Sequence, residues 1–171
     1  MEPSTAVVVG NPKPNSRTLA AAIHLTRELV GRDPELVVDL ATVGSDLLDW
    51  SSTEVAELVA RVGQADLVVV GSPTYKGTYT GLLKLFLDRF DGGRGLHGVA
   101  IPLMLGGSDA HSLAAELTLR PVLTEIGGTV PGRGLYVVDS RYEDPAAYDG
   151  WLADTRPVVR ALLEARERAL A

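Results

Sequence analysis

The sequence predicts a doubly wound α/β sandwich of three layers, with helices on both faces of a five-stranded parallel sheet. Short apolar runs alternate with longer segments of helical periodicity along the 171 residues. The runs, such as residues 7–9 and 67–70, are continuously apolar, which is typical of strands covered on both faces. Gly31 and Gly127 stand at the ends of two helical segments and indicate where those helices stop.

Each expected element follows from its apolar pattern. The first strand is the run around Val8, and the helix after it repeats apolar residues at every third or fourth position from Leu19 to Leu29. In chain order the expected elements are strand 4–10, helix 16–31, strand 35–40, helix 52–63, strand 66–71, helix 79–90, strand 98–105, helix 110–127, strand 130–138 and helix 145–169. Pro102 is unusual in the fourth strand, because proline cannot donate to a sheet ladder.

The composition fits a single domain over residues 1–171, with 46% hydrophobic and 22% charged residues. No apolar run approaches the roughly twenty residues of a membrane span, and the N-terminus lacks a signal pattern, so we expect a cytoplasmic protein. The absence of cysteine excludes disulfides and thiol catalysis. A net charge of −6 argues against nucleic-acid binding, and no His and carboxylate residues have the spacing of a metal site.

The segment from Gly71 to Gly81 is the most informative part of the chain. It follows the third apolar run and leads into a helical pattern, so it forms a turn at the carboxyl edge of the sheet, where open α/β folds bind ligands. For Tyr75 the alternative is that the ring only covers the edge of the sheet. The candidate ligand contacts of this turn are Pro73, Thr74, Tyr75 and Lys76.

A polar loop joins the first strand to the first helix and is suited to bind a phosphate. Unpaired backbone N–H groups and the helix dipole favour an anion there, and side-chain hydroxyls can donate to it. The alternative is that Asn15 or Ser16 only caps the helix. A basic residue such as Arg17 is unfavourable at a helix N-terminus without an anion, which favours the phosphate interpretation. The candidate residues are Asn11, Asn15, Ser16, Arg17 and Thr18, with Lys13 as a second positive charge.

A third loop follows the fourth strand. Gly106 and Gly107 would let a planar ligand approach the backbone closely, and Ser108 follows them before the next helix begins. His111 is a candidate contact for a second substrate, although a solvent-facing histidine is the alternative. The ends of strands one, three and four face the same rim of the sheet, so the three loops are expected to form one site.

One loop suited to phosphate and two suited to a flat group indicate a mononucleotide. In the flavodoxin-like strand order 2-1-3-4-5, the phosphate would bind at the first loop, and FMN fits both ends of such a site. The chain also resembles the NADPH-dependent FMN reductase family, especially the small reductases that partner alkanesulfonate monooxygenases. The segments that carry the resemblance are residues 15–18, 72–84, 106–108 with His111, and 119–123.

The resemblance implies an FMN site in which residues 15–18 hold the phosphate, the backbone of residues 73–76 borders the ring, and residues 106–108 line its other edge. It also implies hydride transfer from NADPH or NADH to flavin N5, for which no protein side chain need act as acid or base. The chain departs from relatives at Asn11, where a serine is common. It departs again at Leu117, where some relatives carry an aromatic residue or histidine associated with a helix interruption.

Three functions are therefore considered. The first is an NAD(P)H-dependent FMN reductase, which either delivers reduced flavin to a flavin-dependent monooxygenase partner or reduces it for general use. The second is a reductase with bound FMN that acts on quinones, azo dyes or metal oxyanions. The third is a flavodoxin-type electron carrier or passive flavin-binding module, which is disfavoured because carriers usually present denser negative charge for docking. A homodimer or homotetramer is expected, because the helix from Leu82 to Phe90 carries more apolar residues than one sheet face requires.

Overall fold

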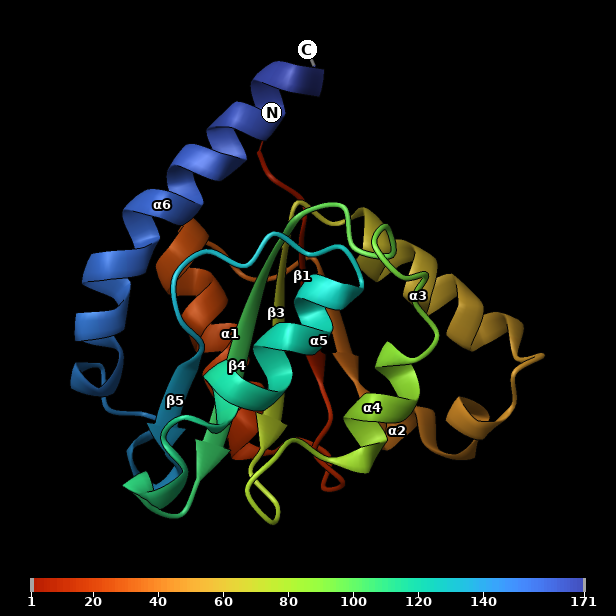
Figure 1. The fold of residues 1–171 in the computed structure, drawn as a ribbon, viewed down its shortest axis with the longest axis horizontal. Coiled ribbons are helices and arrows are strands. Elements are labelled where there is room, and N and C mark those ends of the chain that lie inside the picture. Colours follow the sequence, from red (N-terminus) through yellow and green to blue (C-terminus); the bar gives the residue numbers. More distant parts are fainter. Residues whose placement is uncertain (1, 171) are drawn as a thin grey trace.

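The computed structural model describes residues 2–170, which contain a parallel sheet of five strands in the order β2-β1-β3-β4-β5 (Figure 1). This confirms the predicted fold class. The strands are β1 (Thr5–Val9), β2 (Leu36–Asp39), β3 (Leu67–Pro73), β4 (Val99–Gly106) and β5 (Leu135–Val138). The α-helices are α1 (Arg17–Val30), α2 (Leu40–Val43), α3 (Thr53–Gln64), α4 (Gly81–Leu87), α5 (Arg120–Glu125) and α6 (Ala146–Leu170).

Helices cover both faces of the sheet, as the continuously apolar strands predict. On one face α1 and α6 pack against the sheet, and Leu25 and Trp151 join the same buried cluster. On the other face α3, α4 and α5 form the second layer (Figure 1). All residues of β3 are buried, since this strand lies at the centre of the sheet. Among residues 2–170 no helix is both long and apolar enough to span a bilayer.

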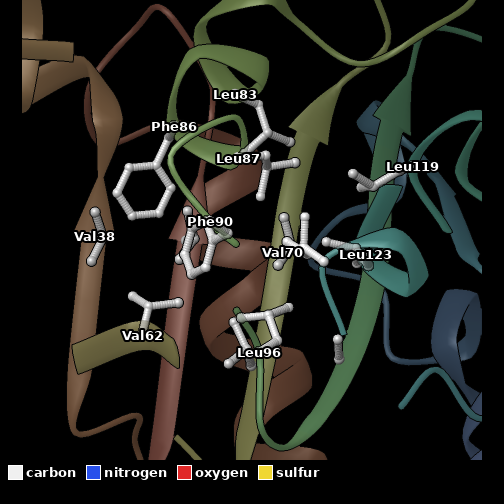
Figure 2. Packing of buried hydrophobic residues seen from close by; sticks show 14 of the residues in the cluster. Val38, Val62, Val70, Leu83, Phe86, Leu87, Phe90, Leu96, Leu119 and Leu123 are labelled. Carbon is white, nitrogen blue, oxygen red and sulfur yellow. The ribbon is translucent and has the colours of Figure 1, made fainter. Parts of the chain in front are cut away.

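The apolar residues of α4 are used mainly inside the domain. Phe86 and Phe90 pack edge to face, with ring centroids 5.4 Å apart, over the strands near Val38 and beside Leu83 (Figure 2). Leu85 remains 37% exposed. The sequence argument that this helix has spare apolar surface for a subunit contact is therefore wrong for most of its residues.

Pro102 lies inside β4 and is tolerated because its missing N–H faces a gap in the pairing. The N–H of Ala100 points toward the β5 side and donates to the carbonyl of Thr129 at 2.9 Å. Backbone N–H groups alternate along a strand, so position 102 faces that same side. Pairing between β4 and β5 begins only at Leu103, opposite Leu135, and no ladder hydrogen bond is lost.

The helix expected over residues 110–127 is broken into three parts, which corrects that prediction. A 3₁₀ turn spans Asp109–His111, a π turn spans Ala115–Leu119, and α5 follows. The Thr118 hydroxyl donates to the carbonyl of Ala114 at 2.6 Å, and Pro121 has no N–H to continue the α-helical ladder. The Thr118 hydroxyl competes for a helical carbonyl and Pro121 lacks a helical donor, so regular α-helical hydrogen bonding is weakened here. The chain widens locally into a π turn.

The start of the fifth strand and the segment after β2 also differ from the expectation. The fifth strand begins at Leu135 and not at residue 130, because Pro131 cannot donate and Gly132 adopts a left-handed conformation with φ of +68°. After β2 the chain forms α2 and a 3₁₀ helix at Gly44–Leu48, which apolar periodicity did not predict. The side chain of Asp39 caps α2 by accepting from the Ala41 N–H.

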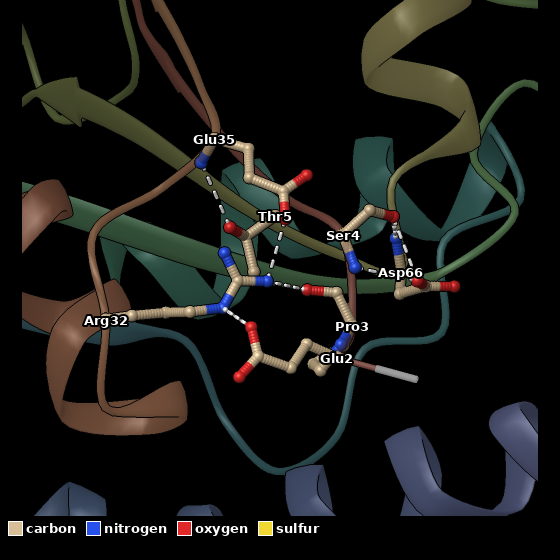
Figure 3. Close-up of polar contacts among 7 residues, drawn as sticks. All are labelled: Glu2, Pro3, Ser4, Thr5, Arg32, Glu35 and Asp66. Atoms are coloured by element: carbon tan, nitrogen blue, oxygen red, sulfur yellow. Dashed lines mark hydrogen bonds and ion pairs between the residues drawn. The ribbon is translucent and has the colours of Figure 1, made fainter.

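The N-terminal segment is held to the amino edge of the sheet by partly buried polar contacts (Figure 3). Asp66 accepts hydrogen bonds from the backbone N–H and the hydroxyl of Ser4, both at 2.9 Å. It also accepts from Nε of Arg166 at 2.6 Å, which ties α6 to the start of β3. Burial opposes ionisation of Asp66, but the hydrogen bonds from Arg166 and Ser4 outweigh it and lower the pKa of this carboxyl.

We predict that Asp66→Asn lowers the free energy of unfolding by about 2 kcal/mol at pH 7, because three donors then lose a charged acceptor. A lowered pKa in the folded state means that the carboxylate stabilises the protein above about pH 4, its ordinary pKa, and that this contribution is lost as pH falls further. Urea unfolding at pH 7 and pH 2.5 measures both effects. Glu57→Gln, an exposed charge change on α3, is the control. If Asp66→Asn lowered the free energy of unfolding equally at pH 7 and pH 2.5, the stabilising role of the Asp66 carboxylate would be wrong.

Candidate functional site

The loop after β1 is ordered by its own side chains and leads directly into α1. Asn11 accepts from the backbone N–H of Lys13 at 2.9 Å, and its Nδ2 donates to Oγ1 of Thr18 at 3.2 Å. Asn15 adopts a left-handed conformation with φ of +52°, which turns the chain into the helix. Ser16 caps α1 by accepting from the Leu19 N–H, as its alternative interpretation predicted. The N-terminus of α1 thus faces the rim of the sheet.

Gly10 allows this loop to lie directly on α4. A Cβ atom at residue 10 would lie 2.3 Å from Cβ of Leu83, so only glycine fits there. The Gly10 N–H donates to the carbonyl of Gly71 at 2.9 Å, and the Thr80 hydroxyl donates to the Gly10 carbonyl. These contacts connect the ends of β1 and β3 to the first turn of α4.

The loop after β3 forms a tight turn at the same rim. The Thr74 N–H donates to the carbonyl of Leu105 at 2.6 Å and extends the pairing of β3 with β4. Tyr75 and Thr78 then pair with each other, and Lys76 and Gly77 both have positive φ between them, as in a type I′ turn. Lys76 therefore occupies the tip of the turn.

The loop after β4 approaches Tyr136 of β5 closely. A Cβ atom at Gly106 would lie 2.0 Å from the Tyr136 hydroxyl, so any larger residue there would displace the Tyr136 side chain. That hydroxyl donates to the carbonyl of Ser108 at 2.7 Å. Burial raises the pKa of Tyr136, so the hydroxyl remains protonated and keeps donating near neutral pH. The neighbouring Thr74 Oγ1 is buried and interacts with the Tyr136 hydroxyl, but that hydroxyl donates to Ser108, and Thr74 Oγ1 makes no hydrogen bond of regular geometry within the described residues.

The three loops line one pocket of about 370 Å³ at the carboxyl edge of the sheet, the lower edge in Figure 1. Most of the residues selected from the sequence lie around it, whereas Lys76, Ser108 and His111 do not line it. His111 instead lies beside the turn after β3, with its ring 3.6 Å from the Cβ position of Gly77. The selected residues that line the pocket are Asn11, Asn15, Ser16, Arg17, Thr18, Pro73, Thr74, Tyr75, Gly106 and Gly107.

Three further residues line the pocket: Lys13, Leu105 and Asp139. Sequence reasoning named Lys13 only as a nearby charge and missed Asp139, which follows β5. Asp139 could have been found, because the end of a fifth parallel strand meets the same rim. No group of three His, Cys, Asp or Glu residues within 2–170 could hold a metal ion.

A larger cavity, of about 540 Å³, lies at the opposite edge of the sheet, between α1, α6 and the N-terminal segment. Its lining includes two arginines, Arg156 and Arg160, but five carboxylates, so its net charge is negative: Glu2, Glu28, Asp66, Glu164 and Glu167. Because these acidic groups would repel a phosphate, the smaller pocket at the carboxyl edge is the better candidate for a nucleotide.

The two departures noted in the sequence have clear places in the structure. The Asn11 side chain is engaged in ordering its own loop, and one proton of Nδ2 remains free to donate. Leu117 lies within the π turn and is 66% exposed. The helix interruption is thus present in this chain without an aromatic residue or histidine at position 117.

Comparison with known proteins agrees with the geometry of this pocket. Residues 3–143 match the profile of the NADPH-dependent FMN reductase family. The NADH-dependent FMN reductase SfnF of Pseudomonas putida is 33% identical over 139 residues, covering 76% of this chain and 74% of that protein. The FMN reductase (NADPH) of Pseudomonas putida KT2440 is 34% identical over 92 residues, which cover 54% of this chain and 47% of the relative.

A solved structure with a similar fold is the apo form of the NADH:FMN oxidoreductase EmoB. It superimposes with a TM-score of 0.79 at 28% identity, over 95% of this chain and 89% of that one. The similarity therefore extends over almost the whole chain.

We predict that Gly10→Ala lowers the free energy of unfolding by about 2 kcal/mol or more, because the new methyl group would overlap the backbone and Cβ of Leu83. Thermal unfolding measures the loss. Gly107→Ala is a matched control at the same rim, since a Cβ atom there would meet nothing within 4 Å. Equal stability of the two variants would show that the loop after β1 does not need close contact with α4.

Proposed function

Because the chain belongs to the NADPH-dependent FMN reductase family, we propose that it oxidises NADPH or NADH and reduces FMN. One observation carries the proposal: the loops after β1, β3 and β4 converge on one pocket of about 370 Å³. Such a pocket, at the carboxyl edge of a parallel sheet, is where doubly wound folds bind nucleotides. The share of the chain that matches the family supports assigning the pocket to FMN.

We infer that the FMN phosphate binds at the loop after β1. The first turn of α1 supplies free backbone N–H groups and the positive end of the helix dipole. Lys13 and Arg17 add two positive charges to the same end of the pocket, and Thr18 adds a hydroxyl. No acidic side chain stands in the first turn of α1, so the helix itself does not oppose an anion there.

The flavin ring would lie between the loops after β3 and β4. Pro73, Thr74 and Tyr75 line one part of the pocket and the backbone of Gly106 and Gly107 another, so a flat group can approach the main chain. The Thr74 hydroxyl has only the Tyr136 hydroxyl beside it and makes no regular hydrogen bond, so it fits a bound polar ligand, because a poorly satisfied buried hydroxyl is costly. We propose that this hydroxyl hydrogen-bonds to the flavin.

The protein contributes binding and orientation. FMN supplies the hydride-accepting chemistry when it is bound. The charged residues that line the pocket, Lys13, Arg17 and Asp139, belong to or contact the loop after β1, at the proposed phosphate end. The ring end is thus lined by backbone, Tyr75 and the Thr74 hydroxyl, which suits a hydride transfer that needs no charged acid or base. Exclusion of water and alignment of the two rings are the tasks left to the chain.

We further propose that reduced FMN is delivered to a flavin-dependent monooxygenase, and that the protein forms a homodimer or homotetramer. Leu113 and Leu117 are 62% and 66% exposed and lie four residues apart at the π turn, so a second copy could cover them. Sedimentation at the mass of one 18.1 kDa chain would contradict the oligomer. The cytoplasmic location expected from the sequence stays a prediction.

The proposed function is tested by an absorbance spectrum of the purified protein and by NADPH and NADH consumption with free FMN, FAD, riboflavin or a quinone. We expect oxidation that saturates with FMN. A yellow protein that ignores added flavin and reduces quinone would favour the quinone, azo or metal-oxyanion reductase instead. Flavin binding without nicotinamide oxidation would favour an electron carrier, and no flavin binding would contradict all three.

We predict that Thr74→Val weakens FMN binding by about three- to tenfold, the effect of losing one hydrogen bond. Stability should stay equal or rise slightly, because valine has nearly the same shape and leaves no buried hydroxyl without a partner. Fluorescence titration with FMN and thermal unfolding measure the two effects. Thr124→Val, on α5 and outside the pocket, is the control for affinity. Unchanged FMN affinity in Thr74→Val would show that this hydroxyl does not hydrogen-bond to the flavin.

A further inference from the structure

An ion pair stands at the proposed phosphate end of the pocket. Arg17 is the first residue of α1, and Asp139 is the first residue of a 3₁₀ turn, Asp139–Arg141, that follows β5. Nη1 of Arg17 lies 3.2 Å from Oδ2 of Asp139, and both residues line the pocket. The fold therefore brings a carboxylate from residue 139 to the same place as the phosphate loop.

The geometry of this pair indicates that it opens easily. The side chains are 60% and 44% exposed, and a single guanidinium nitrogen makes the hydrogen bond, so the pair lacks the two parallel hydrogen bonds of a strong arginine–carboxylate contact. Exposed pairs of this kind add little to folding stability. The guanidinium also lies 6.0 Å from the ring centroid of Tyr142, which keeps Arg17 near the rim.

The charges around the loop after β1 are nearly balanced. Lys13 and Arg17 are positive, whereas Asp139 lines the pocket and Asp39 accepts from the backbone N–H of Asn15 at 2.9 Å. A flavin phosphate carries about two negative charges, so both carboxylates repel it. Asp139 in addition pairs with Arg17, one of the two cations that would bind the phosphate. A site that only had to bind phosphate tightly would not pair its arginine, Arg17, with a carboxylate such as that of Asp139.

We propose that Asp139 competes with the FMN phosphate for Arg17 and thereby keeps FMN affinity low enough for the flavin to exchange. This inference rests on the proposed function and extends it, because it assigns a residue that sets how firmly FMN is held. Phosphate entry would draw Arg17 away from Asp139, and phosphate departure would restore the pair. The competition acts on FMN and not on riboflavin, which has no phosphate.

The test is the affinity of the full-length protein for FMN and for riboflavin, measured by flavin fluorescence titration in low salt. Asp139→Asn keeps the side-chain shape and removes the charge. We expect FMN to bind about three- to tenfold more tightly, with riboflavin affinity changed by less than about twofold. Asp88→Asn is the matched control, because it removes one negative charge and an exposed ion pair with Lys84 outside the pocket.

A second background separates competition for Arg17 from general charge repulsion. In the Arg17→Gln protein, Asp139→Asn should raise the affinity for FMN by less than about twofold, because the guanidinium for which Asp139 and the phosphate compete is absent. An increase of about three- to tenfold in FMN affinity in the Arg17→Gln protein would overturn the proposed competition. Equal increases in the affinities for FMN and riboflavin would overturn it as well. Unchanged or weaker FMN binding by Asp139→Asn would show that the carboxylate orients Arg17 for the phosphate, and would also overturn it.

These failures are distinct from failure of the proposed function. If the unaltered protein binds FMN and oxidises NADPH or NADH, but Asp139→Asn gives no selective gain, only the role of Asp139 is wrong. If the unaltered protein binds neither FMN nor riboflavin, the proposed function falls and the role of Asp139 falls with it.

Discussion

Parallel pairing of β1, β3 and β4 is the constraint on which the rest of the structure depends. Val9 pairs with Gly71 and Pro73 pairs with Leu105, so the three strands end at one edge. Backbone hydrogen bonds continue past the strand ends, from Gly10 to Gly71 and from Thr74 to Leu105. The loops therefore leave the sheet from fixed positions, and a one-residue slip would turn each loop away from the pocket.

Close packing then makes these loops precise enough to bind a ligand. Gly10 contacts the backbone of Leu83 in α4 without room for a methyl group, and Gly106 lies against the Tyr136 side chain of β5. The loops after β1 and β4 are thus each held against a neighbouring element on which the core already depends, since Leu83 is fully buried. A site supported in this way is preorganised, because the loops that line it are fixed by packing against neighbouring elements.

Most of the fold could be predicted because its strands are buried on both faces and its helices are long enough to show their period. The failures were local. A side-chain hydroxyl at Thr118 and the missing N–H of Pro121 break a helix that apolar periodicity predicts as continuous. The position of Lys76 at the tip of a turn depends on backbone conformation, which the pattern did not show. Asp139 enters the site through the end of β5, a strand whose start the pattern misplaced.

Geometry and charge contribute different properties to the site. The convergence of three loops determines where a nucleotide fits, and this follows from the sheet alone. Under the proposed competition, the strength of FMN binding would depend on the charge balance at the first turn of α1, where Arg17 pairs with Asp139. A single exposed carboxylate, which adds little to stability, would then lower the affinity for FMN through the charge that it places beside Arg17.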